Sequence, residues 1–216
     1  MPENVQLEPL HVELPQNKRG HERCIALLDS ATELFLEHGY DAVSLDDIVQ
    51  HAGGSKASIY KYFGNKEGLF RSICDYRRAQ FNQDIQLACK CENEDLRNYL
   101  IRILTNFVQH ILHPKNISFI RLVINQAQKD PNLAVYIHNN GAKNIQNIIA
   151  QALQHEHDQN RLHCPQPLNS AMMYFGLIRD YEWKIILGVV PRIDEQEVNN
   201  HLEYCIDRFL EGHQKR

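Results

Sequence analysis

The stretch SLDDIVQHAGGSKASIYKYFGNK, residues 44–66, indicates two short helices joined by a two-glycine turn. Ser44 and Asp47 have the spacing of a capping box at the start of the first helix. Gly53 can adopt the positive φ that ends a helix, and the second helix is expected over Lys56–Phe63. The segment therefore has the layout of a helix-turn-helix motif.

The second of these helices carries side chains that suit a phosphate backbone. Ile59 and Phe63 form its apolar stripe, so its other positions are left for the outside. Lys56 and Lys66 both stand near helix N-termini, where a cation is unfavourable to the helix dipole, and phosphate would account for them. Small residues such as Ala57 would let the helix approach base edges in the major groove. We therefore predict double-stranded DNA as a partner.

The same residues resemble the DNA-binding motif of the TetR (tetracycline-repressor) family of bacterial transcription regulators, and the resemblance extends from Arg19 to Phe70. One position departs from the family pattern, because Gly54 stands where a small apolar residue is common. Transferred residue by residue, the family's DNA contacts fall on seven positions, and Lys61 is added because of its charge. The predicted DNA-binding residues are Ser44, Lys56, Ala57, Ser58, Tyr60, Lys61, Tyr62 and Lys66.

Length and composition allow two helical domains and exclude several classes of protein. With 216 residues, 43% of them apolar, the chain can form a small DNA-binding domain and a second core. No apolar run is long enough to cross a membrane, and the acidic N-terminus is unlike a signal peptide, so we expect a cytoplasmic protein. The predicted divisions are a disordered arm (1–16), a DNA-binding domain (17–65) and a ligand-binding and dimerisation domain (66–216).

The charge distribution favours site-specific over indiscriminate binding of nucleic acid. The net charge is −4, whereas indiscriminate binders are often strongly basic. The cations of the motif lie in a run from Gly53 to Lys66 that contains no acidic residue. We interpret this run as a small positive patch on a mildly acidic body.

After Lys66 the apolar residues recur with helical spacing, and no run shows the alternation of a β-strand. The sequence therefore predicts an all-α fold of about nine helices. Beyond the three in the DNA-binding domain, they are expected at 66–91, 95–112, 117–129, 132–155 with a possible break at Gly141, 168–189 and 194–212.

The resemblance implies a homodimer, in which the last two helices of each subunit form a four-helix bundle, and a near-palindromic DNA operator. It also implies a pocket for a small-molecule effector within the C-terminal helices. Arg179 is of particular interest, because a buried arginine needs an anionic partner, although it could equally pair with Asp180 or Glu182 at the surface. The candidate pocket residues are Ile103, Phe107, Ile124, Met173, Tyr174, Arg179 and Trp183.

The stretch from Phe119 to Gly141 is similar to the middle of the ligand domain in regulators of lipophile efflux pumps. This similarity implies a lipophilic effector without naming it. Because repression is the common outcome in the resembled family, we expect a repressor that its effector releases from DNA.

Six cysteines raise the question of a metal or redox site. Cys89 and Cys91 are close together, but a structural zinc site needs a second ligand pair, which the sequence lacks. His155, His157, His163 and Cys164 cluster in a polar linker, where such residues are usually solvated. We predict no metal and no cofactor, and leave a metal or redox sensor of the same fold as an alternative.

Two other classes of protein compete with the regulator. An enzyme is not expected, because the common catalytic motifs are missing, and Ser58 to Lys61 matches S-x-x-K without the K-T-G motif that accompanies it. A helical adaptor that retains the shape of the motif without binding DNA is the second alternative.

Overall fold

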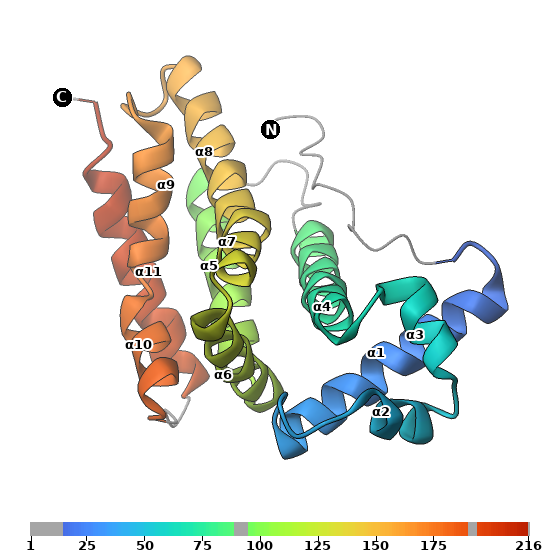
Figure 1. The fold of residues 1–216 in the computed structure, drawn as a ribbon. Helices are drawn as coiled ribbons and strands as arrows, with labels where there is room; N and C mark the ends of the chain where they lie inside the picture. The colour runs from blue at the N-terminus through green and yellow to red at the C-terminus, as the bar shows by residue number, and fades with distance from the viewer. Residues whose placement is uncertain (1–14, 89–94, 190–193, 216) are drawn as a thin grey trace. The chain divides into compact units, whose positions relative to one another are not determined.

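The computed structural model describes residues 15–88, 95–189 and 194–215, and these form eleven helices and no strand (Figure 1). The predicted all-α fold is confirmed, and two of the nine expected helices are each divided into a pair. In chain order the helices are α1 (Lys18–His38), α2 (Leu45–Ala52), α3 (Lys56–Phe63), α4 (Lys66–Ala88), α5 (Leu96–Leu112), α6 (Pro114–Lys129), α7 (Pro131–Asn140), α8 (Ala142–Asp158), α9 (Pro167–Gly176), α10 (Arg179–Leu187) and α11 (Glu195–Glu211).

The described residues fall into two compact units. The N-terminal unit contains residues 15–81 and 118–137, and the C-terminal unit contains residues 82–88, 95–117, 138–189 and 194–215. The predicted boundary at residues 65 and 66 stays a prediction. Most of the predicted N-terminal arm, up to residue 14, lies outside the described residues.

The core of the N-terminal unit is built around α1. The ring centroids of Phe35, Tyr40 and Phe70 lie 5.0–6.0 Å apart, in tilted and edge-on arrangements. Ile48 of α2 and Ile59 of α3 are completely buried in the same cluster. Each such side chain contributes roughly 1.5–3 kcal/mol by leaving water. This burial stabilises α2 and α3, which are too short to persist as isolated helices.

Helix α7 and most of α6 belong to this N-terminal unit, which the apolar periodicity of the sequence did not indicate. Leu133 of α7 is 3% exposed and lies in the same apolar cluster as the helix-turn-helix. Polar contacts join the same elements: Tyr136 Oη donates to Asp75 Oδ2 at 2.6 Å, and Lys129 Nζ donates to Asp41 Oδ2 at 2.5 Å. The helices of the motif therefore share one core with residues far along the chain.

The C-terminal unit places α8 beside α9 and α5 beside α11. Arg97 of α5 donates to both carboxylate oxygens of Asp207 on α11, at 2.5 and 3.0 Å. Tyr174 of α9 is completely buried, and its hydroxyl donates to the Leu100 carbonyl at 2.6 Å. Because a buried hydroxyl needs a partner, this bond favours one position of α9 against α5.

The two helix divisions have different origins. Gly141 separates α7 from α8, a break that the sequence allowed. The single helix expected over 168–189 is instead broken after Gly176, because the N–H groups of Leu177 and Ile178 bond to carbonyls only three residues back. Such bonds tighten the last turn, and Gly176 lowers the helical preference at this point. None of the helices in the described ranges is long and apolar enough to span a membrane.

Candidate nucleic-acid interface

The first helix of the motif, α2, begins at a complete capping box. The Ser44 side chain accepts from the Asp47 backbone N–H at 3.2 Å, and Asp47 Oδ2 accepts from the Ser44 backbone N–H at 2.7 Å. Hydrogen bonds from the Ser44 hydroxyl and then from its N–H lower the pKa of the Asp47 carboxyl. The inferred capping box is confirmed, and Ser44 itself is exposed.

The turn between α2 and α3 requires only one of its two glycines. Gly53 has φ 67° and ψ 35°, a left-handed conformation that glycine adopts without steric cost. A Cβ atom at Gly54 would lie 3.5 Å from Leu27 Cδ2, which is an ordinary contact. The departure from the family pattern at Gly54 therefore leaves the motif intact, and α3 starts from Ser55, whose side chain accepts from Ser58 N.

Half of the predicted DNA-binding residues lie on the exposed side of α3. Tyr60 is 55% exposed, whereas the preceding residue, Ile59, is completely buried. Because an α-helix has 3.6 residues per turn, consecutive side chains point in different directions. Ile59 therefore faces the core while Tyr60 faces solvent. The exposed predicted residues of α3 are Lys56, Ala57, Tyr60 and Lys61.

Lys56 has an acidic neighbour in the preceding helix. Its ammonium group lies 2.7 Å from Asp46 Oδ2, and the hydrogen bond between them raises the pKa of Lys56. This contact offers a reason other than phosphate for a cation at the start of α3. Both side chains are substantially exposed, and solvent weakens such pairs, so a phosphate could displace Asp46 at little cost.

Two predicted contacts on α3 are less accessible than expected. Ser58 is 8% exposed, so its expected outward orientation is wrong. Its hydroxyl lies 3.1 Å from Ser55 Oγ and its N–H bonds to the same atom, which makes it part of the cap of α3. Tyr62 is half-buried and packs against the apolar cluster, with its ring 6.3 Å from that of Phe63. Both residues help to hold α3 in place.

Lys66 is engaged within the protein. Its Nζ donates to the Tyr40 carbonyl oxygen at 2.5 Å and lies 4.3 Å from the centroid of the Tyr40 ring. Partial burial lowers the pKa of this ammonium, while Asp41 and Asp47 oppose the decrease. A structural contact therefore also explains a cation at the start of α4.

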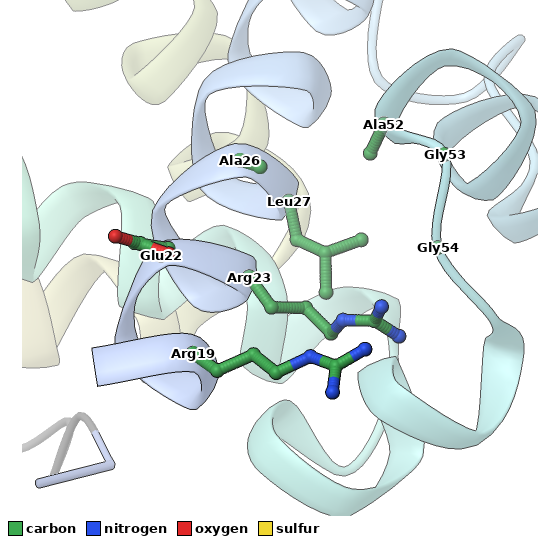
Figure 2. Close-up of a pocket in the computed structure, with 8 residues that line it drawn as sticks. All are labelled: Arg19, Glu22, Arg23, Ala26, Leu27, Ala52, Gly53 and Gly54. Atoms are coloured by element: carbon green, nitrogen blue, oxygen red, sulfur yellow. The ribbon is translucent and has the colours of Figure 1, made fainter. Parts of the chain in front are cut away.

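A cavity of about 240 Å³ lies between α1 and the turn of the motif, and its arginines were not among the predicted residues (Figure 2). Arg19 and Arg23 of α1 and the backbone of Gly53 and Gly54 contribute to its lining. A signal for them existed in the sequence. The first turn of α1 contains no acidic residue and includes Arg19, although the helix dipole favours acidic residues there.

The predicted effector-pocket residues occupy different environments. Tyr174 is buried and reaches α5, the helix that carries the buried Ile103 and the half-buried Phe107. Met173 and Trp183 are more than half exposed. Ile124 belongs to the N-terminal unit, whereas the other six belong to the C-terminal unit.

Arg179 lies at the surface. Its side chain is 79% exposed and its Nη1 lies 3.8 Å from Glu182 Oε2. Of the two interpretations of Arg179, the buried arginine that needs an anionic ligand is therefore wrong, and the surface pair with Glu182 is the one that the structure shows. Its place at the first turn of α10, beyond the break in the expected helix, leaves the long side chain in solvent.

His157 and Cys164, near the end of α8, belong to a set of hydrogen bonds that also includes Ser170 and His213. Cys164 Sγ donates to Ser170 Oγ at 3.3 Å, and Ser170 Oγ lies 2.8 Å from His213 Nε2. His157 Nδ1 accepts from the Cys164 backbone N–H at 3.3 Å. No group of three or more metal-ligating side chains occurs in the described part of the chain, and Cys89 and Cys91 lie outside it.

Comparison with known proteins assigns both parts of the chain to regulators. Residues 27–73 match the family described as "Bacterial regulatory proteins, tetR family". Residues 98–214, more than half of the chain, match "AefR-like transcriptional repressor, C-terminal domain". The chain belongs to the TetR family. This family is one of DNA-binding transcriptional regulators and not of enzymes, which confirms the class expected from the sequence.

Individual relatives agree with this assignment. The chain is 39% identical over 75 residues to the HTH-type transcriptional repressor ComR of Escherichia coli K12, a match that spans 35% of this chain and only 36% of ComR. A TetR-family regulator from Mesorhizobium loti superposes with a TM-score of 0.81 at 22% identity, over 92% of this chain and 100% of that one, and shows the same fold. The flavonoid-responsive regulator FrrA has a TM-score of 0.75 and 27% identity, over 90% and 98% of the two chains.

Proposed function

We propose that this TetR-family protein acts in the cytoplasm as a homodimeric repressor that occupies a near-palindromic operator and is released by a small lipophilic effector. The observation that carries the DNA-binding part is the exposed side of α3, where Lys56, Ala57, Tyr60 and Lys61 stand on a helix held by a buried core. A rigid support matters, because base contacts require side chains in defined positions.

The dimensions and chemistry of α3 fit a major groove. An α-helix with its side chains is roughly 10–12 Å across, which matches the roughly 12 Å width of the groove. Ala57 leaves room for close approach to base edges, and the exposed hydroxyl of Tyr60 can donate to a phosphate oxygen. Lys56 and Lys61 add positive charge on the same helix.

The proposed dimer draws support from exposed apolar side chains on α9 and α10. Trp183 and Leu187 are 55% and 61% exposed, although residues of this size are normally withdrawn from water. A second copy of the same surface would bury them and would set two recognition helices about 34–36 Å apart on one side of the DNA. Met172, Met173 and Ile186 share this exposure.

The proposed effector class rests on two observations of different kinds. Tyr174, Phe175 and Phe107 give the C-terminal unit an aromatic interior near α5, with the Phe107 and Phe175 rings 5.7 Å apart. FrrA, by its name, is responsive to flavonoids. Both favour a lipophilic effector for this chain.

Selection of binding sites from a random duplex pool tests the DNA-binding role even though the operator is not identified. The wild-type protein is expected to enrich a near-palindromic motif, and the double variant K56A/Y60A is expected to enrich none. Substitution of Lys143, an exposed cation of the C-terminal unit, by alanine is the control and should enrich the same motif as the wild type.

Failure of a well-folded wild-type protein to enrich any motif would contradict the proposal and favour the helical adaptor. If a motif is recovered, the same duplex serves to screen lipophilic compounds for release. A compound that releases the wild type lowers its affinity without changing the motif.

A further inference from the structure

Two arginine side chains line one side of the cavity beside the turn of the helix-turn-helix (Figure 2). Arg19 and Arg23 are one helical turn apart on α1, and Figure 2 shows both side chains extended in the direction of the α2–α3 connection. Glu22, which also borders the cavity, extends from the opposite side of α1 in that view. The space of about 240 Å³ is thus faced by two guanidinium groups.

These two arginines have no ion pair or hydrogen-bond partner among the described side chains. Like charges four residues apart weaken a helix by about 0.2–0.5 kcal/mol. Cations in the first turns of a helix are also opposed by its dipole. Helix stability therefore does not explain why arginines stand at positions 19 and 23. An anionic partner from outside the chain would explain them.

The opposite wall of the cavity consists of the small Ala52 and the two glycines that follow it. Gly53 and Gly54 line it, and no heavy atom lies within 4 Å of the position where a Cβ of Gly53 would stand. The chain passes from this wall directly into Ser55, the cap of α3. An anion held by the arginines would therefore lie beside the N-terminal end of the recognition helix.

We propose that Arg19 and Arg23 bind a phosphodiester of the operator at the edge of the groove that α3 enters. This inference rests on the proposed function, because it assigns two further DNA contacts to the same interface. A guanidinium suits the role, since its planar donors match two phosphate oxygens. DNA is favoured over a free anion because the cavity is open to solvent and belongs to the unit whose α3 exposes Lys56 and Lys61.

The contribution of phosphate contacts is measured by the dependence of affinity on salt. The double variant R19Q/R23Q is compared with the wild type on the selected operator between 50 and 200 mM salt. The slope of log affinity against log salt should become shallower by about 0.9 for each phosphate that is no longer neutralised, or about 1.8 for the two phosphates bound by a dimer. The selected motif itself should not change, because phosphate contacts carry no base information.

The matched control is K115Q/K143Q, which removes the same charge from exposed positions of the C-terminal unit. Its slope should equal that of the wild type. R19K/R23K should keep most of the slope, because an ammonium also neutralises a phosphate. A slope for R19Q/R23Q equal to that of the wild type would overturn the inference while leaving the proposed function intact. A wild-type protein that selects no motif would instead overturn the proposed function.

Thermal unfolding without DNA tests whether the cavity binds a free anion instead of an operator phosphate. Inorganic phosphate, added at constant ionic strength, should not raise the melting temperature of the wild type more than that of R19Q/R23Q. A rise specific to the wild type, together with unchanged DNA slopes, would assign the cavity to a free phosphate-like ligand and contradict the proposal. Loss of folding in R19Q/R23Q is not expected, because both side chains are exposed, and the melting temperature checks it.

Discussion

At the scale of single residues, the ammonium group of Lys66 anchors the segment that follows α1 by binding to Tyr40. It combines a hydrogen bond to the Tyr40 carbonyl with positions over the rings of Tyr40 and Phe35, at 4.3 and 5.7 Å from their centroids. The aromatic faces attract the cation, and the carbonyl oxygen accepts a hydrogen bond from it. This lysine therefore stabilises the unit that presents α3, in addition to any contact with DNA.

Replacement of Lys66 by methionine keeps the apolar stem and removes the charge. We expect the free energy of unfolding to fall by about 1–2 kcal/mol, because the variant can form neither the charged hydrogen bond nor the cation–π interaction. Urea unfolding followed by circular dichroism measures this change. K143M, which removes an exposed cation of the C-terminal unit, should stay within about 0.5 kcal/mol of the wild type. Equal stability of K66M and wild type would show that the internal interactions of Lys66 contribute nothing.

The capping box of α2 makes the free energy of unfolding depend on pH in the acid range. Hydrogen bonds from Ser44 lower the folded-state pKa of Asp47 below its usual 3.8. The stabilisation is therefore complete above pH 3.8 and is lost as the pH falls through the lower folded-state value. The difference in urea midpoint between wild type and D47N should be constant near neutrality and should shrink below pH 3.8. A difference that grows in acid would contradict the assigned hydrogen bonds.

At the scale of helices, α4 and α7 are joined by a buried polar group. Asp75 of α4 is 3% exposed and accepts from the Tyr136 hydroxyl at 2.6 Å, while Arg78 lies 3.2 Å from its other oxygen. Burial, and then this hydrogen bond, raise the pKa of Tyr136. The contact holds α7 against the helix that follows the DNA-reading motif.

Substitution of Tyr136 by phenylalanine should destabilise the protein by about 1–3 kcal/mol, because a buried carboxylate loses one of its donors. Y60F, which removes an exposed hydroxyl, should have no measurable effect on stability and serves as the control. Equilibrium unfolding in urea distinguishes the two. A Y136F protein as stable as Y60F would mean that water replaces the missing hydroxyl.

At the scale of the whole molecule, assembly depends on the apolar surface of α9 and α10. Trp183→Glu places a charge within this surface and should shift the protein from dimer to monomer at micromolar concentration in sedimentation velocity runs. V135E is the matched control, because Val135 is 60% exposed on α7 in the N-terminal unit. Dimerisation that survives W183E but fails in V135E would relocate the interface to the N-terminal unit.

The local features of the motif were predictable because they depend on residues within one turn of each other. The Ser44–Asp47 box, the left-handed Gly53 and the cap at Ser55 all involve contacts over at most four residues. The helices followed from apolar periodicity, apart from the break after Gly176, where glycine and short-range carbonyl bonds compete with a continuing helix.

Contacts between distant segments were decided only by the tertiary structure. Sequence alone determined an all-α chain with a DNA-reading motif, but did not indicate that Leu133 and Tyr136 share the core of that motif. Nor did it show that Arg19 and Arg23 border the turn at Gly53, since these residues come together only when α1 packs across α2. Helical periodicity specifies which side of a helix is buried, whereas the partner that buries it depends on the packing of the whole unit.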